Sequence, residues 1–158
     1  YGHHESVAGF GVDVEWYLHS KAPGWGKPVS DIEARKWEIQ VKSHNRKYRL
    51  FLKHWNRFRM PPRFRGDILF VTDSQRFTGF GHFIREMAGY WADFFYPNAV
   101  GFQVGYPADR KWWRRFGNPQ RDIALQLAGT TRQECSFFWV DFTLREALAM
   151  NKNMEEKQ

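Results

Sequence analysis

Two carboxylates two positions apart stand in the apolar stretch 9–17, GFGVDVEWY. If this stretch is a β-strand, side-chain alternation places Asp13, Glu15 and Tyr17 on one face. A neighbouring negative charge and burial raise the pKa of a carboxyl group, which keeps it protonated for a general-acid role. Paired carboxylates are typical of glycoside hydrolysis, so Glu15 is the predicted acid and Asp13 its electrostatic partner. The alternative is that either acid simply pairs with one of the many arginines.

Polar and aromatic residues also stand at the carboxyl ends of four later apolar runs. Indole and phenol rings stack on the C–H faces of pyranose rings, while carboxylate and amide groups hydrogen-bond to sugar hydroxyls. In (β/α) barrels the site is built from the carboxyl ends of several strands. The residues predicted to line a sugar cleft are Tyr17, His54, Asp73, Gln75, Gln103, Tyr106, Trp139 and Asp141.

Five apolar runs that would carry these residues are predicted to be strands. Their hydrophobicity is nearly continuous, as expected of parallel strands covered on both faces. They are Val7–Tyr17, Tyr48–Trp55, Asp67–Thr72, Ala99–Tyr106 and Ser136–Phe142.

Helical patterns lie between most of these runs. A capping box at 30–33 predicts a helix to Ser43, and the apolar spacing over 80–95 is that of a helix packed on one side. Asn118-Pro119 predicts a helix start that Gly129 would end. A second capping box, 143–146, predicts a terminal helix.

Strands that alternate with helices favour a parallel α/β sheet, either open and doubly wound or part of a barrel. Only eleven residues separate Trp55 from Asp67, which leaves little room for a helix there. Gly9-x-Gly11 lies inside a strand and opens no helix, so a nucleotide-binding sheet is disfavoured. The prediction is one parallel (β/α) barrel-type domain over residues 1–150 with a frayed polar tail over 151–158.

The sequence GVDVEWY resembles the Asp-x-Glu strand of the family 18, chitinase-like glycoside hydrolases and of the family 25, lysozyme-like hydrolases. In family 18 the acid matches Glu15, and its neighbour, matching Asp13, positions the substrate N-acetyl group as internal nucleophile. The two earlier aspartates of that pattern fall on Gly11 and Ala8 and are absent. Trp139 is similar to the tryptophan that forms the floor of the sugar site in family 18.

The segments FVTDSQ, FFYPNAVGFQVGYPADRKWW and FFWVDFT resemble an uncharacterised bacterial group of barrel hydrolases. These resemblances imply a (β/α)8 barrel acting on an N-acetylhexosamine-containing polymer, and hence an extracytoplasmic or secreted location. A complete barrel takes roughly 200–250 residues. The 158 residues, which lack an initial methionine, are therefore expected to be a fragment comprising the C-terminal five strand–helix units of a TIM barrel.

Composition leaves two rival functions open. The chain has a formal net charge of +7 and is 18% aromatic, and bases mix with aromatic residues over 53–66 and 109–117. Such segments suit an acidic glycan, but they also suit single-stranded nucleic acid, which is the second choice of partner. The third hypothesis is a non-catalytic carbohydrate-binding barrel.

Other chemistries find little support in the sequence. No apolar run approaches the roughly 18–20 residues of a membrane span. His3-His4-Glu5 is a weak metal motif because adjacent histidines on a strand point apart, and no Gly-x-Ser-x-Gly elbow surrounds Ser74. No metal and no cofactor are predicted, the lone Cys135 excludes an internal disulfide, and the oligomeric state is left open.

Overall fold

The five predicted strands form one parallel sheet whose strand order follows the sequence. The computed structural model describes residues 5–18 and 26–155. The strands, each shorter than its predicted run, are β1 (Gly9–Asp13), β2 (Arg49–Lys53), β3 (Ile68–Thr72), β4 (Val100–Val104) and β5 (Cys135–Trp139). The predicted α/β class with a parallel sheet is confirmed. Among the described residues β1 and β5 each pair with a single neighbour, so the sheet has two open edges.

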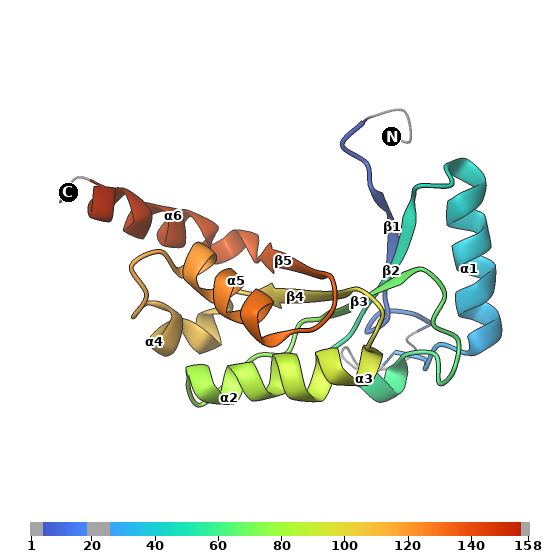
Figure 1. Ribbon diagram of the computed structural model, residues 1–158, viewed down its shortest axis with the longest axis horizontal. Helices are drawn as coiled ribbons and strands as arrows, with labels where there is room; N and C mark the ends of the chain where they lie inside the picture. The colour runs from blue at the N-terminus through green and yellow to red at the C-terminus, as the bar shows by residue number, and fades with distance from the viewer. Residues whose placement is uncertain (1–4, 19–25, 156–158) are drawn as a thin grey trace.

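Helices connect the strands (Figure 1). They are α1 (Asp31–His44), the 3-10 turn η1 (Arg57–Arg59), α2 (Phe80–Ile84), the π-helical η2 (Arg85–Ala92), α3 (Asp93–Phe95), the 3-10 turn η3 (Pro107–Asp109), α4 (Arg110–Trp113), α5 (Pro119–Thr130) and α6 (Asp141–Glu155). The helix predicted over 80–95 is confirmed as the continuous run of α2, η2 and α3. None of the described helices is long and apolar enough to cross a lipid bilayer.

The capping signals were mostly correct. Ser30 and Glu33 form the predicted capping box at the start of α1. The Ser30 Oγ accepts from the Glu33 backbone N–H at 3.2 Å, and Glu33 Oε2 accepts from the Ser30 N–H at 2.9 Å. Asn118 Oδ1 likewise accepts from the Arg121 N–H at the start of α5. The predicted cap at Thr143 is wrong, since α6 begins at Asp141. The buried Thr143 hydroxyl instead donates to the Gly105 carbonyl and accepts from Trp139 Nε1, so tertiary partners satisfy it.

The two faces of the sheet differ. Alternate residues such as Leu50, Phe70 and Phe102 are fully buried beneath the helices. On the opposite face Phe51 and Phe138 are 37% and 42% exposed, so the expectation that both faces are covered is wrong for the described part of the chain. In Figure 1 the helices lie to the right of, below and to the left of the strands, and none lies between β1 and α6.

Strand order explains this one-sided coverage. Parallel strands taken in sequence order by right-handed crossovers put every connecting helix on the same face, whereas a doubly wound sheet reverses its order part-way. The order β1-β2-β3-β4-β5 therefore excludes the doubly wound alternative.

Aromatic side chains fill the space between sheet and helices. Phe70 of β3 stacks on Phe95 of α3 with ring centroids 4.1 Å apart, and Trp91 Nε1 donates to the Phe70 carbonyl at 3.0 Å. These contacts anchor β3, the strand from which the loop at residue 73 leaves.

Candidate active site at the carboxyl ends of the strands

A tight turn after β1 places Glu15. Strand β1 ends at Asp13, and the fully buried Val14 donates its N–H to the Lys53 carbonyl at 2.9 Å. The Glu15 N–H then donates to Asp13 Oδ1 at 3.2 Å, and the Trp16 N–H to the Asp13 carbonyl. This turn directs the Glu15 carboxyl group over the ends of the neighbouring strands.

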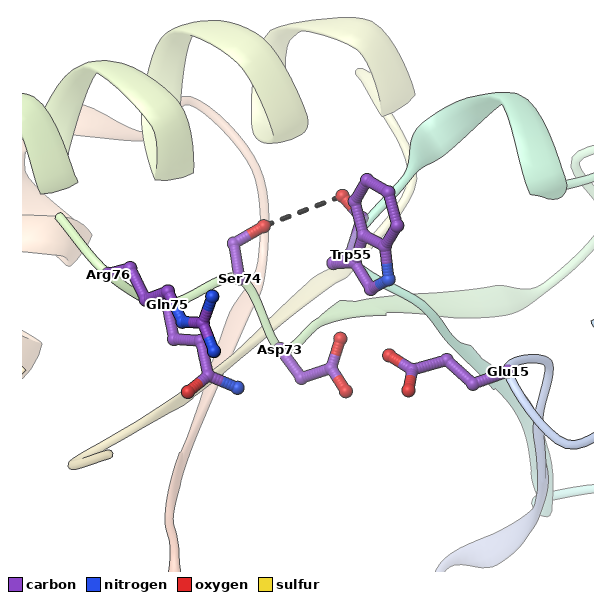
Figure 2. Close-up of a pocket in the computed structure, with 6 residues that line it drawn as sticks. All are labelled: Glu15, Trp55, Asp73, Ser74, Gln75 and Arg76. Atoms are coloured by element: carbon purple, nitrogen blue, oxygen red, sulfur yellow. Dashed lines mark hydrogen bonds between the residues drawn. The ribbon is translucent and has the colours of Figure 1, made fainter. Parts of the chain in front are cut away.

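The loop after β3 supplies the facing carboxylate. Asp73 follows Val71 by two positions and continues the face of the sheet that the helices leave bare. It is only 7% exposed. A pocket of about 470 Å³ is lined by Glu15, Trp55, Asp73, Ser74, Gln75 and Arg76. Figure 2 shows the carboxyl groups of Glu15 and Asp73 turned toward each other across this pocket.

Lys53 joins the two strand ends electrostatically. Its Nζ lies 2.9 Å from Asp13 Oδ2 and 2.7 Å from Asp73 Oδ2. Burial disfavours the charge of Lys53, but the two carboxylates outweigh that effect and raise its pKa above the usual value. Asp13 therefore forms an ion pair with a lysine. The sequence had predicted that Asp13 is either the electrostatic partner of Glu15 or the ion-pair partner of an arginine.

The environment of Glu15 favours the protonated form of its carboxyl group. Burial and the negative charge of Asp73 raise its pKa from 4.5 to about 7, although Lys53 opposes the shift. Asp73 Oδ1 is buried and has no hydrogen-bond partner among the described residues. A proton on Glu15 would offer this oxygen a donor, which is the form of Glu15 that its raised pKa favours.

Two of the other predicted residues adjoin this pair. Gln103 Nε2 donates to the Tyr106 hydroxyl at 2.7 Å. Burial, together with the charges of Asp73 and Glu15, raises the pKa of Tyr106 to about 12, so its phenol stays neutral. Gln103 also lines a hollow of about 360 Å³ on the bare face of the sheet, beside Asp13 and Lys53.

Three predicted residues lie away from the pocket. Tyr17 follows the turn, where strand alternation no longer applies, and its hydroxyl donates to Glu33 Oε1 at 2.7 Å. Trp139 alternates with Phe138 and so faces the helices, packing against the buried Trp113. Asp141 is exposed as the first residue of α6.

His54 is fully buried and does not line the pocket. Its Nδ1 accepts from the Asn56 N–H at 2.8 Å, which assigns the ring proton to Nε2. Burial lowers the pKa of His54 to about 4, more than the nearby Asp73 raises it. The ring is therefore neutral at physiological pH and supports Trp55, its neighbour in the pocket wall.

Sequence reasoning missed three contributors, namely Lys53, Trp55 and Arg76. Lys53 pairs in register with Asp13, but this register is a property of the assembled sheet. Both histidines of His3-His4-Glu5 lie outside the described residues. Within the described ranges no three His, Cys, Asp or Glu side chains gather closely enough to hold a metal ion.

Comparison with known protein families, characterised proteins and solved structures finds no match to this chain. The likeness of GVDVEWY to the family 18 and family 25 strands stays a prediction, and function must be argued from the pocket itself.

Proposed function

We propose that the protein is a carbohydrate-active hydrolase in which Glu15 is the general acid and Asp73 its partner. The observation that carries this proposal is the pair of facing carboxyl groups of Glu15 and Asp73, set in a pocket at the carboxyl ends of parallel strands (Figure 2). Sites of barrel enzymes are built at this end of the strands. The partner role predicted for Asp13 passes to Asp73, because Lys53 holds both Asp13 and the far oxygen of Asp73.

The chemistry follows from the two protonation states. Cleavage of a glycosidic bond needs an acid that protonates the leaving oxygen. A pKa raised to about 7 makes Glu15 available as a proton donor near neutral pH. Asp73, paired with Lys53, orients that proton and stabilises the positive charge that develops on the sugar. The ring of Trp55, 40% exposed, offers a face for the pyranose.

The closeness of the pair favours substrate assistance. Retaining enzymes that use a carboxylate nucleophile hold their carboxyl groups about 5–5.5 Å apart, and inverting enzymes about 6.5–9.5 Å apart. The carboxyl groups of Glu15 and Asp73 point toward each other with none of the drawn side chains between them, which suits an acid and its partner better than a nucleophile on the opposite side of a sugar (Figure 2). An N-acetyl group of the substrate would then be the nucleophile, as the family 18 resemblance implies, and the substrate class would be N-acetylhexosamine-containing glycans.

We also propose that the five strands are consecutive units of a (β/α)8 barrel. Support comes from the sequential order, the helices on one face and the two unpaired edges. The exposed apolar side chains Phe51 and Phe138 occupy the face that a closed barrel fills with side chains.

The test is release of reducing ends from N-acetylhexosamine oligosaccharides, followed by mass spectrometry. Glu15→Gln should lower the rate by about 10²–10⁴-fold, the usual contribution of a general acid, while still binding the oligosaccharide. Asp141→Asn is the matched control and should retain full activity. Binding without cleavage by the unaltered protein would establish a non-catalytic sugar-binding module instead, and cleavage that survives Glu15→Gln would exclude the mechanism.

A further inference from the structure

A second cleft, of about 590 Å³, adjoins the Glu15–Asp73 pocket. Arg76 lines both spaces, so they are neighbours on either side of this residue in the loop after β3. The lining of this cleft includes three cations and three aromatic rings: Arg76, Lys111, Arg115, Phe80, Trp112 and Phe116.

The cations of α4 and the turn after it divide into two sets. Arg110 and Arg114, four positions apart, both bind Glu146 of α6, at 3.0 and 2.7 Å. Lys111 and Arg115, each one position later in the chain than Arg110 and Arg114, line the cleft. Both are exposed, and neither makes an ion pair within the part of the chain that the structure describes.

Arg76 adds a third cation, held in an unusual backbone conformation. Its φ of 69° lies in the left-handed region, which is unfavourable for a residue with a Cβ. Such conformations persist where the surrounding structure imposes them, often at binding sites. Figure 2 shows the Arg76 side chain beside Gln75, on the side of the pocket opposite Glu15.

Aromatic rings line the space between these cations. Phe80 packs edge-on against Phe116 with centroids 4.9 Å apart, and lies 5.8 Å from the largely buried Trp112. Apolar ring surface suits the C–H face of a sugar, while guanidinium and ammonium groups bind carboxylate or sulfate. A sugar unit that carries an anionic group satisfies both features of the cleft.

We propose that this cleft binds an anionic sugar unit, so that the substrate is an acidic glycan whose charged unit lies beside the bond attacked at Glu15. The inference rests on the proposed function and names its substrate class. A nucleic-acid strand fits less well, because its uniformly charged backbone would have to pass the carboxylates of Glu15 and Asp73. A glycan in which charged and neutral units alternate places no charge there.

The test measures binding to the Glu15→Gln protein, which prevents turnover. The probes are oligosaccharides of hyaluronan (carboxylate only), of chondroitin sulfate (carboxylate and sulfate) and of chitin (uncharged), with oligodeoxythymidine of similar length. Either acidic glycan should bind at least 10-fold more tightly than chitin oligosaccharides. Preference for chondroitin sulfate over hyaluronan would identify sulfate as the recognised group, and equal binding would identify the carboxylate.

Matched double variants locate the effect. Lys111→Gln/Arg115→Gln should weaken acidic-glycan binding at least 10-fold and leave chitin binding unchanged. Lys36→Gln/Arg145→Gln removes the same charge from exposed positions on α1 and α6 and should change neither. Equal loss in both double variants, or equal affinity for chitin and hyaluronan, overturns the inference. Oligodeoxythymidine binding that exceeds both glycans and is lost only in the cleft variant makes the ligand a nucleic acid.

The two proposals can fail separately. Glu15-dependent cleavage of chitin oligosaccharides by a protein that does not bind the acidic glycans supports the proposed function and overturns this inference. Acidic-glycan binding through Lys111 and Arg115, with no hydrolysis that depends on Glu15, supports this inference and overturns the proposed function.

Discussion

Replacing Glu15 by glutamine is expected to stabilise the folded protein at alkaline pH while abolishing activity. In the folded state the pKa of Glu15 is about 7, against an ordinary value of 4.5. Because the folded-state pKa is raised, the stability linked to Glu15 is fully present below about pH 4.5 and is lost as pH rises through about 7. Above that pH the ionised Glu15 faces the carboxylate of Asp73, and glutamine removes this repulsion.

The size of the effect follows from the pKa. Each pH unit between the two pKa values is worth about 1.4 kcal/mol, which gives an upper bound of about 3.4 kcal/mol. Glu15 is partly exposed, and solvent screening reduces this to about 1–2 kcal/mol. The glutamine amide can also donate to the buried Asp73 Oδ1, as the protonated acid does. For a chain of this size the gain corresponds to a rise in Tm of roughly 3–6 °C.

The assay is urea denaturation of the unaltered protein and of Glu15→Gln at pH 4 and pH 8. The two proteins should be equally stable within about 0.5 kcal/mol at pH 4 and should separate at pH 8. Asp141→Asn, which removes one exposed carboxylate, should show no such divergence. A Glu15→Gln protein that is less stable at pH 8, or that differs by the same amount at both pH values, would refute the raised pKa of Glu15 beside Asp73.

Three further perturbations test the surroundings of the pocket. Lys53→Met leaves two carboxylates without their cation and should cost about 3 kcal/mol in urea denaturation at pH 8; a cost under 1 kcal/mol would argue against an electrostatic role. The pKa of His54 is lowered to about 4, so in a Glu15→Gln background the unfolding free energy should fall by up to about 3 kcal/mol as pH drops from 6.5 toward 4. His54→Asn should flatten that slope, and a slope that persists would assign it to another group. Phe70→Ala removes a fully buried ring stacked on Phe95 and should lower the unfolding free energy by about 3–5 kcal/mol, whereas a loss under 1 kcal/mol would mean that the core repacks.

Local patterns in the sequence were sufficient to predict the elements. Apolar runs located all five strands, and the Ser30 and Asn118 caps located the starts of α1 and α5, because these signals depend on residues within one or two turns of each other. The same logic failed at Thr143, whose hydroxyl is satisfied by Gly105, far away in the chain. It also failed at Tyr17, where the strand had already ended at Asp13.

Glu15, Asp73, Gln103 and Tyr106 could be proposed from the sequence because polar residues close the apolar runs. Trp139 and Asp141 met the same criterion and lie elsewhere. Position along the chain shows that a strand is ending, but the face on which the next side chain points depends on the residue at which the strand stops.

The sequence by itself determined the alternation of strands and helices, the parallel α/β class and the presence of acidic and aromatic groups at the strand ends. Only the tertiary structure decided that Lys53 forms an ion pair with Asp13, that the carboxyl group of Asp73 faces that of Glu15, and that Arg76 lies between the acidic pocket and a basic cleft. The physical reason is that these partnerships depend on strand register and on turns between segments up to sixty residues apart. Two acids interact, or a charge is neutralised, only when the packed sheet brings two side chains within a few ångströms.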